Sequence, residues 1–181
     1  MRNSAVALCF VSLALGSPSW SGELGNVFGT EEIQAASRLA SAAALGALEL
    51  CISALKQREL GVEGGTDLLK AADTLFSASG QMRKLLDSDF PDFDFTVEEL
   101  DRIQTHLGAT GLRYEDIFNA KRFSEFFAAF LLLGDRLAAA MKQASTLGPD
   151  QSALATFSEL LADYIIIGEL VSELSRSRNL R

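Results

Sequence analysis

The sequence predicts an all-α protein, a four-helix-type bundle made of two antiparallel helical hairpins. Apolar side chains recur every three or four residues through each long segment, which is the spacing of a helix face and not the alternation of a strand. The two helices of each predicted hairpin are separated by a short turn that contains glycine, and short connections make antiparallel neighbours. We expect an acidic loop rich in phenylalanine and aspartate, followed by a short helix, to bridge the two hairpins.

The first 21 residues have the features of a secretory signal peptide. Arg2 supplies a positive charge, residues 5–15 form an apolar run, and small residues end the segment at Ser21. The run is shorter than the roughly 20 residues that cross a bilayer, so we expect no transmembrane anchor in the mature chain. We therefore expect a periplasmic or secreted protein in which residues 22–29 are a linker. A buried N-terminal helix is the alternative interpretation.

The first hairpin is expected over residues 30–86. Its first helix, from about Thr30 to Leu60, carries two adjacent apolar seams, one mostly of alanine and one of larger side chains. A helix with two such seams packs on more than one neighbour. Three glycines within residues 61–65 mark the turn, and a second helix follows from about Thr66 to Leu86.

The second hairpin is expected over residues 123–175. Its first helix, at about 123–147, contains the uninterrupted apolar run Phe126 to Leu133, which places this helix at the centre of the bundle. A Gly-Pro pair at 148–149 stops that helix, and Asp150 can cap the last one. The first helices of both hairpins end in a similar Ala-apolar-Lys-Gln stretch, which leaves a duplication open.

The chain has the length of a single domain. About 160 residues remain once the expected leader is removed, and we place one helical domain at residues 30–175. Residues 176–181 carry three arginines and are expected to form a frayed basic tail. Loss of the leader leaves Cys51 as the one cysteine, without a partner for a disulfide. Its helical neighbours are apolar, so we expect a buried core thiol.

The bridge between the hairpins contains the candidate metal site. Its aspartates are clustered oxygen donors of the kind that calcium prefers, so calcium is the one cofactor the sequence suggests. As a twelve-residue calcium loop the stretch fails at two central positions, the fifth, which is proline, and the sixth, which is not glycine. A non-standard site remains possible. Its candidate ligands are Asp87, Asp89, Asp92 and Asp94.

A local interpretation accounts for the second half of the same stretch. Thr96 followed three residues later by Glu99 is a capping box, and Phe95 before the cap with Leu100 after it forms a hydrophobic staple. The short helix is expected over residues 97–107, because Gly108 and Gly111 follow. If the preceding residues are extended, their phenylalanines share one face and can cover an end of the bundle, while the aspartates point to water.

The sequence contains no recognisable catalytic constellation. His106 is the only histidine, and we expect it in the last turn of the short helix, where an imidazolium favours the exposed carbonyls. The buried Cys51 is expected to be unreactive. No haem, zinc or phosphate-binding motif is present in the sequence, so we predict a protein that is not an enzyme.

Four glycines lie well inside the long predicted helices: Gly46, Gly80, Gly134 and Gly168. Each costs on the order of 1 kcal/mol relative to alanine, so something should compensate. Close helix contact or a local kink is one explanation. The alternative is an apolar cavity between the helices that holds a ligand. The residues predicted to line such a pocket are Phe126, Phe130, Leu161 and Ile165.

Charge and composition favour binding to protein over binding to nucleic acid. The net charge is −8, with 24 acidic against 16 basic residues, and such a surface repels nucleic acid. We predict a non-catalytic binding protein that acts through a protein or envelope partner, with a homo-oligomer as one form of this interaction. This hypothesis expects an exposed apolar patch or an oligomer that depends on concentration. A carrier or sensor of a small apolar ligand is the alternative.

Overall fold

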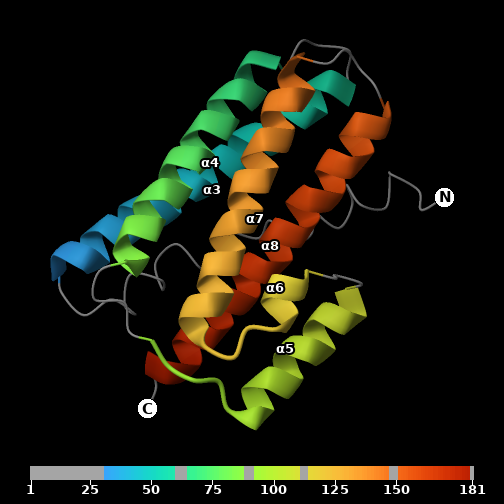
Figure 1. Ribbon diagram of the computed structural model, residues 1–181. Helices are drawn as coiled ribbons and strands as arrows, with labels where there is room; N and C mark the ends of the chain where they lie inside the picture. Colours follow the sequence, from blue (N-terminus) through green and yellow to red (C-terminus); the bar gives the residue numbers. More distant parts are fainter. Residues whose placement is uncertain (1–30, 60–64, 88–91, 111–113, 147–150, 180–181) are drawn as a thin grey trace.

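The computed structural model describes residues 31–59, 65–87, 92–110, 114–146 and 151–179. These residues are almost entirely helical, with no strand among them, so the all-α prediction is confirmed (Figure 1). The helices are α3 (Glu31–Glu59), α4 (Gly65–Leu86), α5 (Val97–Thr110), α6 (Glu115–Phe118), α7 (Phe123–Thr146) and α8 (Gln151–Asn179). The expected leader at 1–21 and linker at 22–29 lie outside the described residues.

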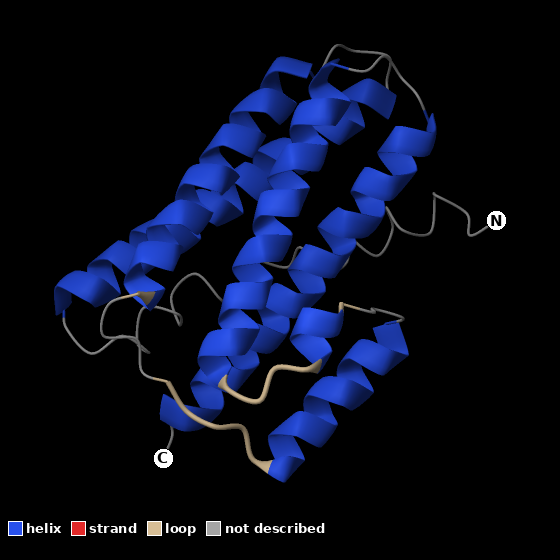
Figure 2. Ribbon diagram, in the orientation of Figure 1, coloured by secondary structure: helices blue, strands red, loops and turns tan. Residues whose placement is uncertain are grey.

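The four long helices lie side by side, and each runs opposite to its neighbour in the row (Figure 1). Their backbones approach one another closely in the order α3, α4, α7, α8, so α3 lies at one end of this row. Helices α4 and α7, which belong to different predicted hairpins, also pack against each other. The helices α5 and α6 lie at the end where α4 finishes and α7 begins, and the described loops are gathered there (Figure 2).

Two helix ends differ from the sequence prediction. Helix α5 continues through Gly108 to Thr110, so it ends three residues later than predicted, directly before Gly111. Gly108 is exposed and a methyl group on it would meet no other atom within 4 Å, which shows a glycine tolerated within a helix, not a terminating one. Helix α8 continues to Asn179, beyond the start of the predicted tail at residue 176. Residues 169–179 contain no glycine or proline, so nothing in the local sequence ends the helix earlier.

Helix α7 supplies the centre of the core, as the apolar run predicts. It lies between α4 and α8 and is also covered by α6. Within the run from Phe126 to Leu133, the side chain of Leu132 is nevertheless 48% exposed. The rest of the run is buried or half-buried.

Candidate functional site

The acidic stretch between the hairpins is held by a short antiparallel backbone pairing with the residues that precede α7. The amide of Phe95 donates to the carbonyl of Lys121 at 2.9 Å, and the amide of Phe123 donates to the carbonyl of Phe93 at 2.9 Å. Asp94 and Arg122 face each other in this bridge. The alternation of phenylalanine and aspartate predicted an extended segment, but the sequence carried no signal for its partner.

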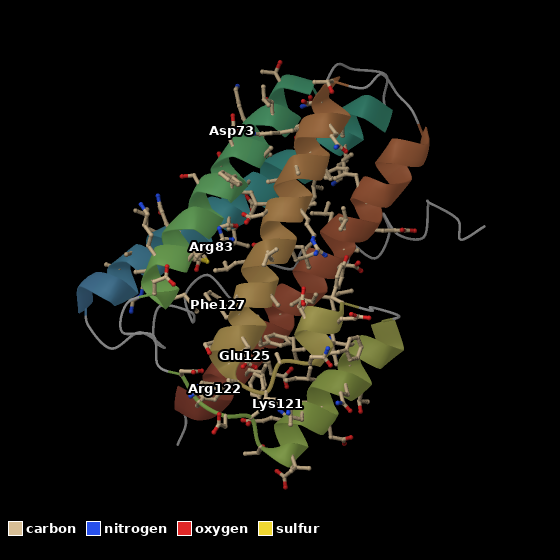
Figure 3. The ribbon with its side chains drawn as sticks, in the orientation of Figure 1. Asp73, Arg83, Lys121, Arg122, Glu125 and Phe127 are labelled. Atoms are coloured by element: carbon tan, nitrogen blue, oxygen red, sulfur yellow. The ribbon has the colours of Figure 1, made fainter. Side chains whose placement is uncertain are left out.

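Asp94 is exposed to water as predicted, and both Asp92 and Asp94 also pair with Arg122. Arg122 makes two ion pairs, one from Nη2 to Asp92 Oδ2 and one from Nε to Asp94 Oδ1, each 3.0 Å long. Asp92 Oδ1 also accepts a hydrogen bond from the backbone amide of Ser124 at 3.1 Å. This amide is in the first turn of α7, so Asp92 caps the helix from a distant part of the chain. Arg122 lies at the lower end of α7 in Figure 3.

The predicted metal ligands are therefore only partly brought together. Asp92 and Asp94 share one guanidinium, Asp87 is exposed at the end of α4, and Asp89 lies outside the described residues. Among the described residues there is no group of three or more histidine, cysteine, aspartate or glutamate side chains that could hold a metal ion. The calcium hypothesis for the four aspartates stays a prediction, and the visible role of two of them is to stabilise the start of α7.

The predicted capping box is confirmed at the start of α5. The backbone amide of Thr96 donates to Glu99 Oε2 at 2.8 Å, and the amide of Glu99 donates to Thr96 Oγ1 at 3.2 Å. Glu99 is only 8% exposed, so its carboxylate is fixed at this position. Phe95 is buried as the staple requires, and Leu100 packs against the same core.

Aromatic rings form a continuous series from this loop into the centre of the protein. Phe93 stacks on Phe123 with ring centroids 4.8 Å apart, Phe123 lies 6.1 Å from Phe127, and Phe127 lies 6.1 Å from Phe130. Phe130 then stacks on Tyr164 of α8 at 4.6 Å. The series gives the centre of the bundle a rigid, ring-on-ring packing.

The residues predicted to line an apolar pocket lie within or beside this series. All four are buried: Phe126, Phe130, Leu161 and Ile165. The ring of Phe126 contacts Phe95 edge to face at 6.0 Å, and Phe130 lies between two other rings. In the described part of the chain these positions are filled by neighbouring side chains, and this packing gives no support to the pocket.

The internal glycines differ from one another in their surroundings. A methyl group built on Gly134 would lie 2.9 Å from Ser79 Oγ of α4 and 3.1 Å from Tyr164 Cε2 of α8. Close helix contact is therefore the reason for glycine at this position. At Gly46 and Gly80 a methyl group would meet no other atom within 4 Å, so close contact within the described chain does not explain them.

Polar groups lie beside the Gly134 contact, at the edge of the apolar core. Arg83 Nη2 contacts Asp135 Oδ2 at 2.6 Å and joins α4 to α7. In the described part of the chain, the buried atoms Asp135 Oδ1 and Ser79 Oγ have no hydrogen-bond partner. Burial, together with the charge of Asp135, raises the pKa of Tyr164 well above its ordinary value. Polar groups without partners are costly to bury, so these residues restrict how α4, α7 and α8 can pack against one another.

A second polar contact holds the segment before α6 against α8. The hydroxyl of Tyr114 donates to Asp163 Oδ2 at 2.8 Å. Burial raises the pKa of Asp163 above its ordinary value of 3.8, which the hydrogen bond from Tyr114 partly offsets. A crevice with room for about one water molecule lies beside this contact, lined by residues that include Tyr114, Leu132 and Arg136.

The two residues with potential catalytic chemistry lie apart from these contacts. Cys51 is fully buried, as predicted, and burial strongly raises the pKa of its thiol, which keeps it protonated. His106 is exposed in α5, a short distance before the end of the helix at Thr110. Neither forms a group of nucleophile and base with another described residue.

One side of α3 is exposed along the described length of the helix. We call these residues the α3 outer face: Ala35, Arg38, Leu39, Ala42, Gly46, Glu49, Ser53 and Lys56. Three of them are charged, and Leu39, Ala42 and Gly46 form an uncharged strip beside the charged residues. Leu39 is 69% exposed, second only to Val97 among the large apolar side chains that the structure describes. The segment Arg38–Gln57 is long and apolar enough to cross a membrane by length and composition, but half of it is buried inside the fold, as in a core helix.

The comparisons with known proteins give no family. No protein-family model, curated protein or solved structure matches the chain. The functional interpretation therefore rests on the geometry of the chain itself.

Proposed function

We propose that this protein is exported, folds as a single four-helix-type bundle, and acts by binding a protein or envelope partner rather than by catalysis. In this proposal the bundle consists of two antiparallel hairpins, bridged by the acidic loop and α5. The close approach of α3 to α4 and of α7 to α8 supports the hairpins. The backbone pairing of residues 93–95 with 121–123 supports the bridge.

The observation that carries the binding function is the α3 outer face. The solvent side of a surface helix is normally rich in charged residues. Here Leu39, Ala42 and Gly46 are exposed on consecutive turns of the helix. This strip is uncharged although charged residues flank it, and its exposed Leu39 side chain supports binding to a partner. The competing function, a carrier of a small apolar ligand, needs internal space at positions that aromatic rings fill.

Site-specific photo-cross-linking tests this proposal in the native host. A photoreactive residue at Ala42, on the α3 outer face, is expected to give a discrete cross-linked adduct. The same residue at Thr105, exposed on α5, is the matched control and should give none. Equal labelling at the two positions, or no adduct at Ala42, would contradict binding through α3.

Cell fractionation followed by N-terminal sequencing tests the expected export. The mature protein should be found outside the cytoplasm and should begin at Gly22, the residue after the expected cleavage site. A chain that retains Met1 in the cytoplasmic fraction would contradict the proposed location without affecting the cross-linking result.

A further inference from the structure

We infer that α5 is a releasable cover over a helix-binding surface of α8. When α5 moves away, this surface binds an amphipathic helix of a partner protein in its place. The surface is separate from the α3 outer face, so the inference goes beyond the proposed function and does not depend on it.

Helix α5 is attached to the rest of the protein less extensively than the long helices are. Of its described side chains, only Glu99, Ile103 and Leu107 are buried, and Leu100 is half-buried. About half of the residues of α7 are buried by comparison. The short helix α6 runs close to α7, whereas α5 lies at the edge of the protein and runs close to none of the described helices (Figure 1). Elements with few buried apolar contacts open at a lower free energy than the whole protein unfolds.

The chain on either side of α5 is held independently of it. Before α5, the backbone pairing of residues 93–95 with 121–123 holds the acidic segment against the start of α7. After α5, the hydroxyl of Tyr114 donates to Asp163 of α8, and Ile117 of α6 is buried. Helix α5 can therefore leave its place while the flanking segments and the four long helices keep theirs.

The part of α8 that lies nearest to α5 is apolar. An ion pair from Arg102 Nη1 to Glu173 Oε1, 3.3 Å long, joins α5 to α8. Glu173 follows Asp163 after nearly three helical turns, so these two acids mark one side of α8. Ile166 and Leu170 fall between them on that side, the first half-buried and the second buried. Release of α5 uncovers this part of α8.

Helix α5 itself shows which occupant this surface accepts. It presents two apolar side chains four residues apart, Ile103 and Leu107, and a basic residue, Arg102, that pairs with Glu173. A partner helix with the same arrangement can replace it, with a lysine or arginine directly before the first apolar residue. Amphipathic helices that lie in apolar grooves are a recurring mode of peptide recognition.

The closed position is the ground state, because Ile103 and Leu107 are buried in it. The ion pair of Arg102 with Glu173 adds little to its stability, because both side chains are more than half exposed. The open form should therefore be a minor population of the free protein, which a partner helix increases by binding to it.

Native-state hydrogen exchange on the full wild-type chain measures the opening directly. The amides within α5 should exchange together, at least roughly tenfold faster than the slowest amides of α4 and α7. The amides of Phe95 and Phe123 donate in the backbone pairing beside α5 and should stay protected. Exchange of α5 as slow as that of α7 would overturn the inference, and so would loss of protection at Phe95 and Phe123 together with α5.

Fluorescence anisotropy with a labelled peptide of residues 96–110, the sequence of α5, tests the surface beneath it. The peptide should bind weakly to the wild type, because α5 occupies the same place. Ile103→Ala in the full chain weakens the attachment of α5 and should raise the affinity for the peptide roughly tenfold. Thr105→Ala, at an exposed position of α5, is the matched control and should leave the affinity unchanged.

Two results of the peptide experiment would overturn the inference. One is an equal affinity of Ile103→Ala and Thr105→Ala for the peptide. The other is undiminished binding of a peptide that carries Ile103→Asp and Leu107→Asp, because such a peptide lacks the apolar side chains that the surface accepts.

Charge reversal tests whether α8 is the surface beneath α5. Arg102→Glu places a like charge beside Glu173 and should speed the exchange of the α5 amides about twofold to fivefold. Addition of Glu173→Arg should restore the wild-type rate, because the pair is then complementary again. A double variant whose α5 amides exchange as fast as those of Arg102→Glu would overturn the placement of α5 on α8.

Discussion

Replacement of Gly134 by alanine should destabilise the protein, whereas the same replacement at Gly80 should stabilise it. Both glycines lie inside long helices, so the change in helix propensity is the same in the two variants. Their surroundings differ. A methyl group at Gly80 meets no other atom within 4 Å, and one at Gly134 lies 3.1 Å from the ring of Tyr164 and 2.9 Å from Ser79 Oγ.

The expected magnitudes follow from two opposing effects. Alanine in place of an interior helical glycine stabilises by about 0.5–1 kcal/mol, and Gly80→Ala should show this gain alone. At Gly134 the ring of Tyr164 is stacked on Phe130 at 4.6 Å and cannot easily withdraw. Overpacking of this kind costs about 1–3 kcal/mol, so we expect a net loss of about 0.5–2 kcal/mol for Gly134→Ala.

Urea unfolding followed by circular dichroism measures both variants under conditions where the transition is two-state. Adding Ser79→Ala to Gly134→Ala should recover part of the loss, because it removes the nearest atom to the new methyl group. The recovery should exceed the effect of Ser79→Ala in the wild type, which is the coupling that a double-mutant cycle isolates. If Gly134→Ala is as stabilising as Gly80→Ala, the close contact of three helices is refuted.

Three further predictions concern the ends of the helices and the contact with α8. Thr96→Ala removes one hydrogen bond of the capping box and should cost about 0.5–2 kcal/mol, with faster amide exchange in α5. Asp92→Ala removes both an ion pair and the hydrogen bond to the start of α7, so it should be more destabilising than Asp101→Ala in thermal melts. Asp163 has a raised pKa in the folded protein, so the folded state keeps this proton after the unfolded chain has lost it. Its contribution to stability is full below its ordinary pKa of 3.8 and declines as the pH rises through the raised value. Asp163→Asn, which keeps an acceptor for the hydroxyl of Tyr114, should therefore lose less stability than the wild type from about pH 4 upward.

Each of these predictions has a control and an outcome that contradicts it. Thr105→Ala, on the exposed side of α5, is the control for Thr96→Ala, and equal losses would show that the capping box contributes nothing specific. Asp101→Ala should leave the thermal stability close to that of the wild type. A larger loss of stability for Asp101→Ala than for Asp92→Ala would contradict the stabilisation of the start of α7 by Asp92. Parallel stability curves for the wild type and Asp163→Asn would mean that the raised pKa has no bearing on folding.

Features that depend on neighbouring residues could be predicted from the sequence. The capping box of Thr96 and Glu99 involves residues three apart, and the structure has both of its hydrogen bonds. The burial of Cys51 follows from apolar residues on the adjacent turns of the same helix. In such cases the local helix geometry alone determines which atoms meet.

Features that depend on distant segments could not be predicted. Nothing in the acidic stretch indicates that Asp92 and Asp94 share Arg122, because that contact depends on how the chain returns to begin α7. The four internal glycines are equivalent as sequence, yet only the packing of α4 and α8 against α7 shows that Gly134 is crowded and Gly80 is open. The side of α3 that stays exposed also depends on which helices lie beside it.

The pairing of residues 93–95 with 121–123 has a consequence for how the chain can vary. This pairing joins the two ends of the segment that contains α5 and α6. The residues that enter and leave the segment are therefore held together by backbone hydrogen bonds. Lengthening a loop whose ends are already joined costs little, only about 0.6 kcal/mol for each doubling. Residues inserted between α5 and α6 should therefore be tolerated, whereas α5 and α6 themselves must be retained because Ile103, Leu107 and Ile117 belong to the buried core.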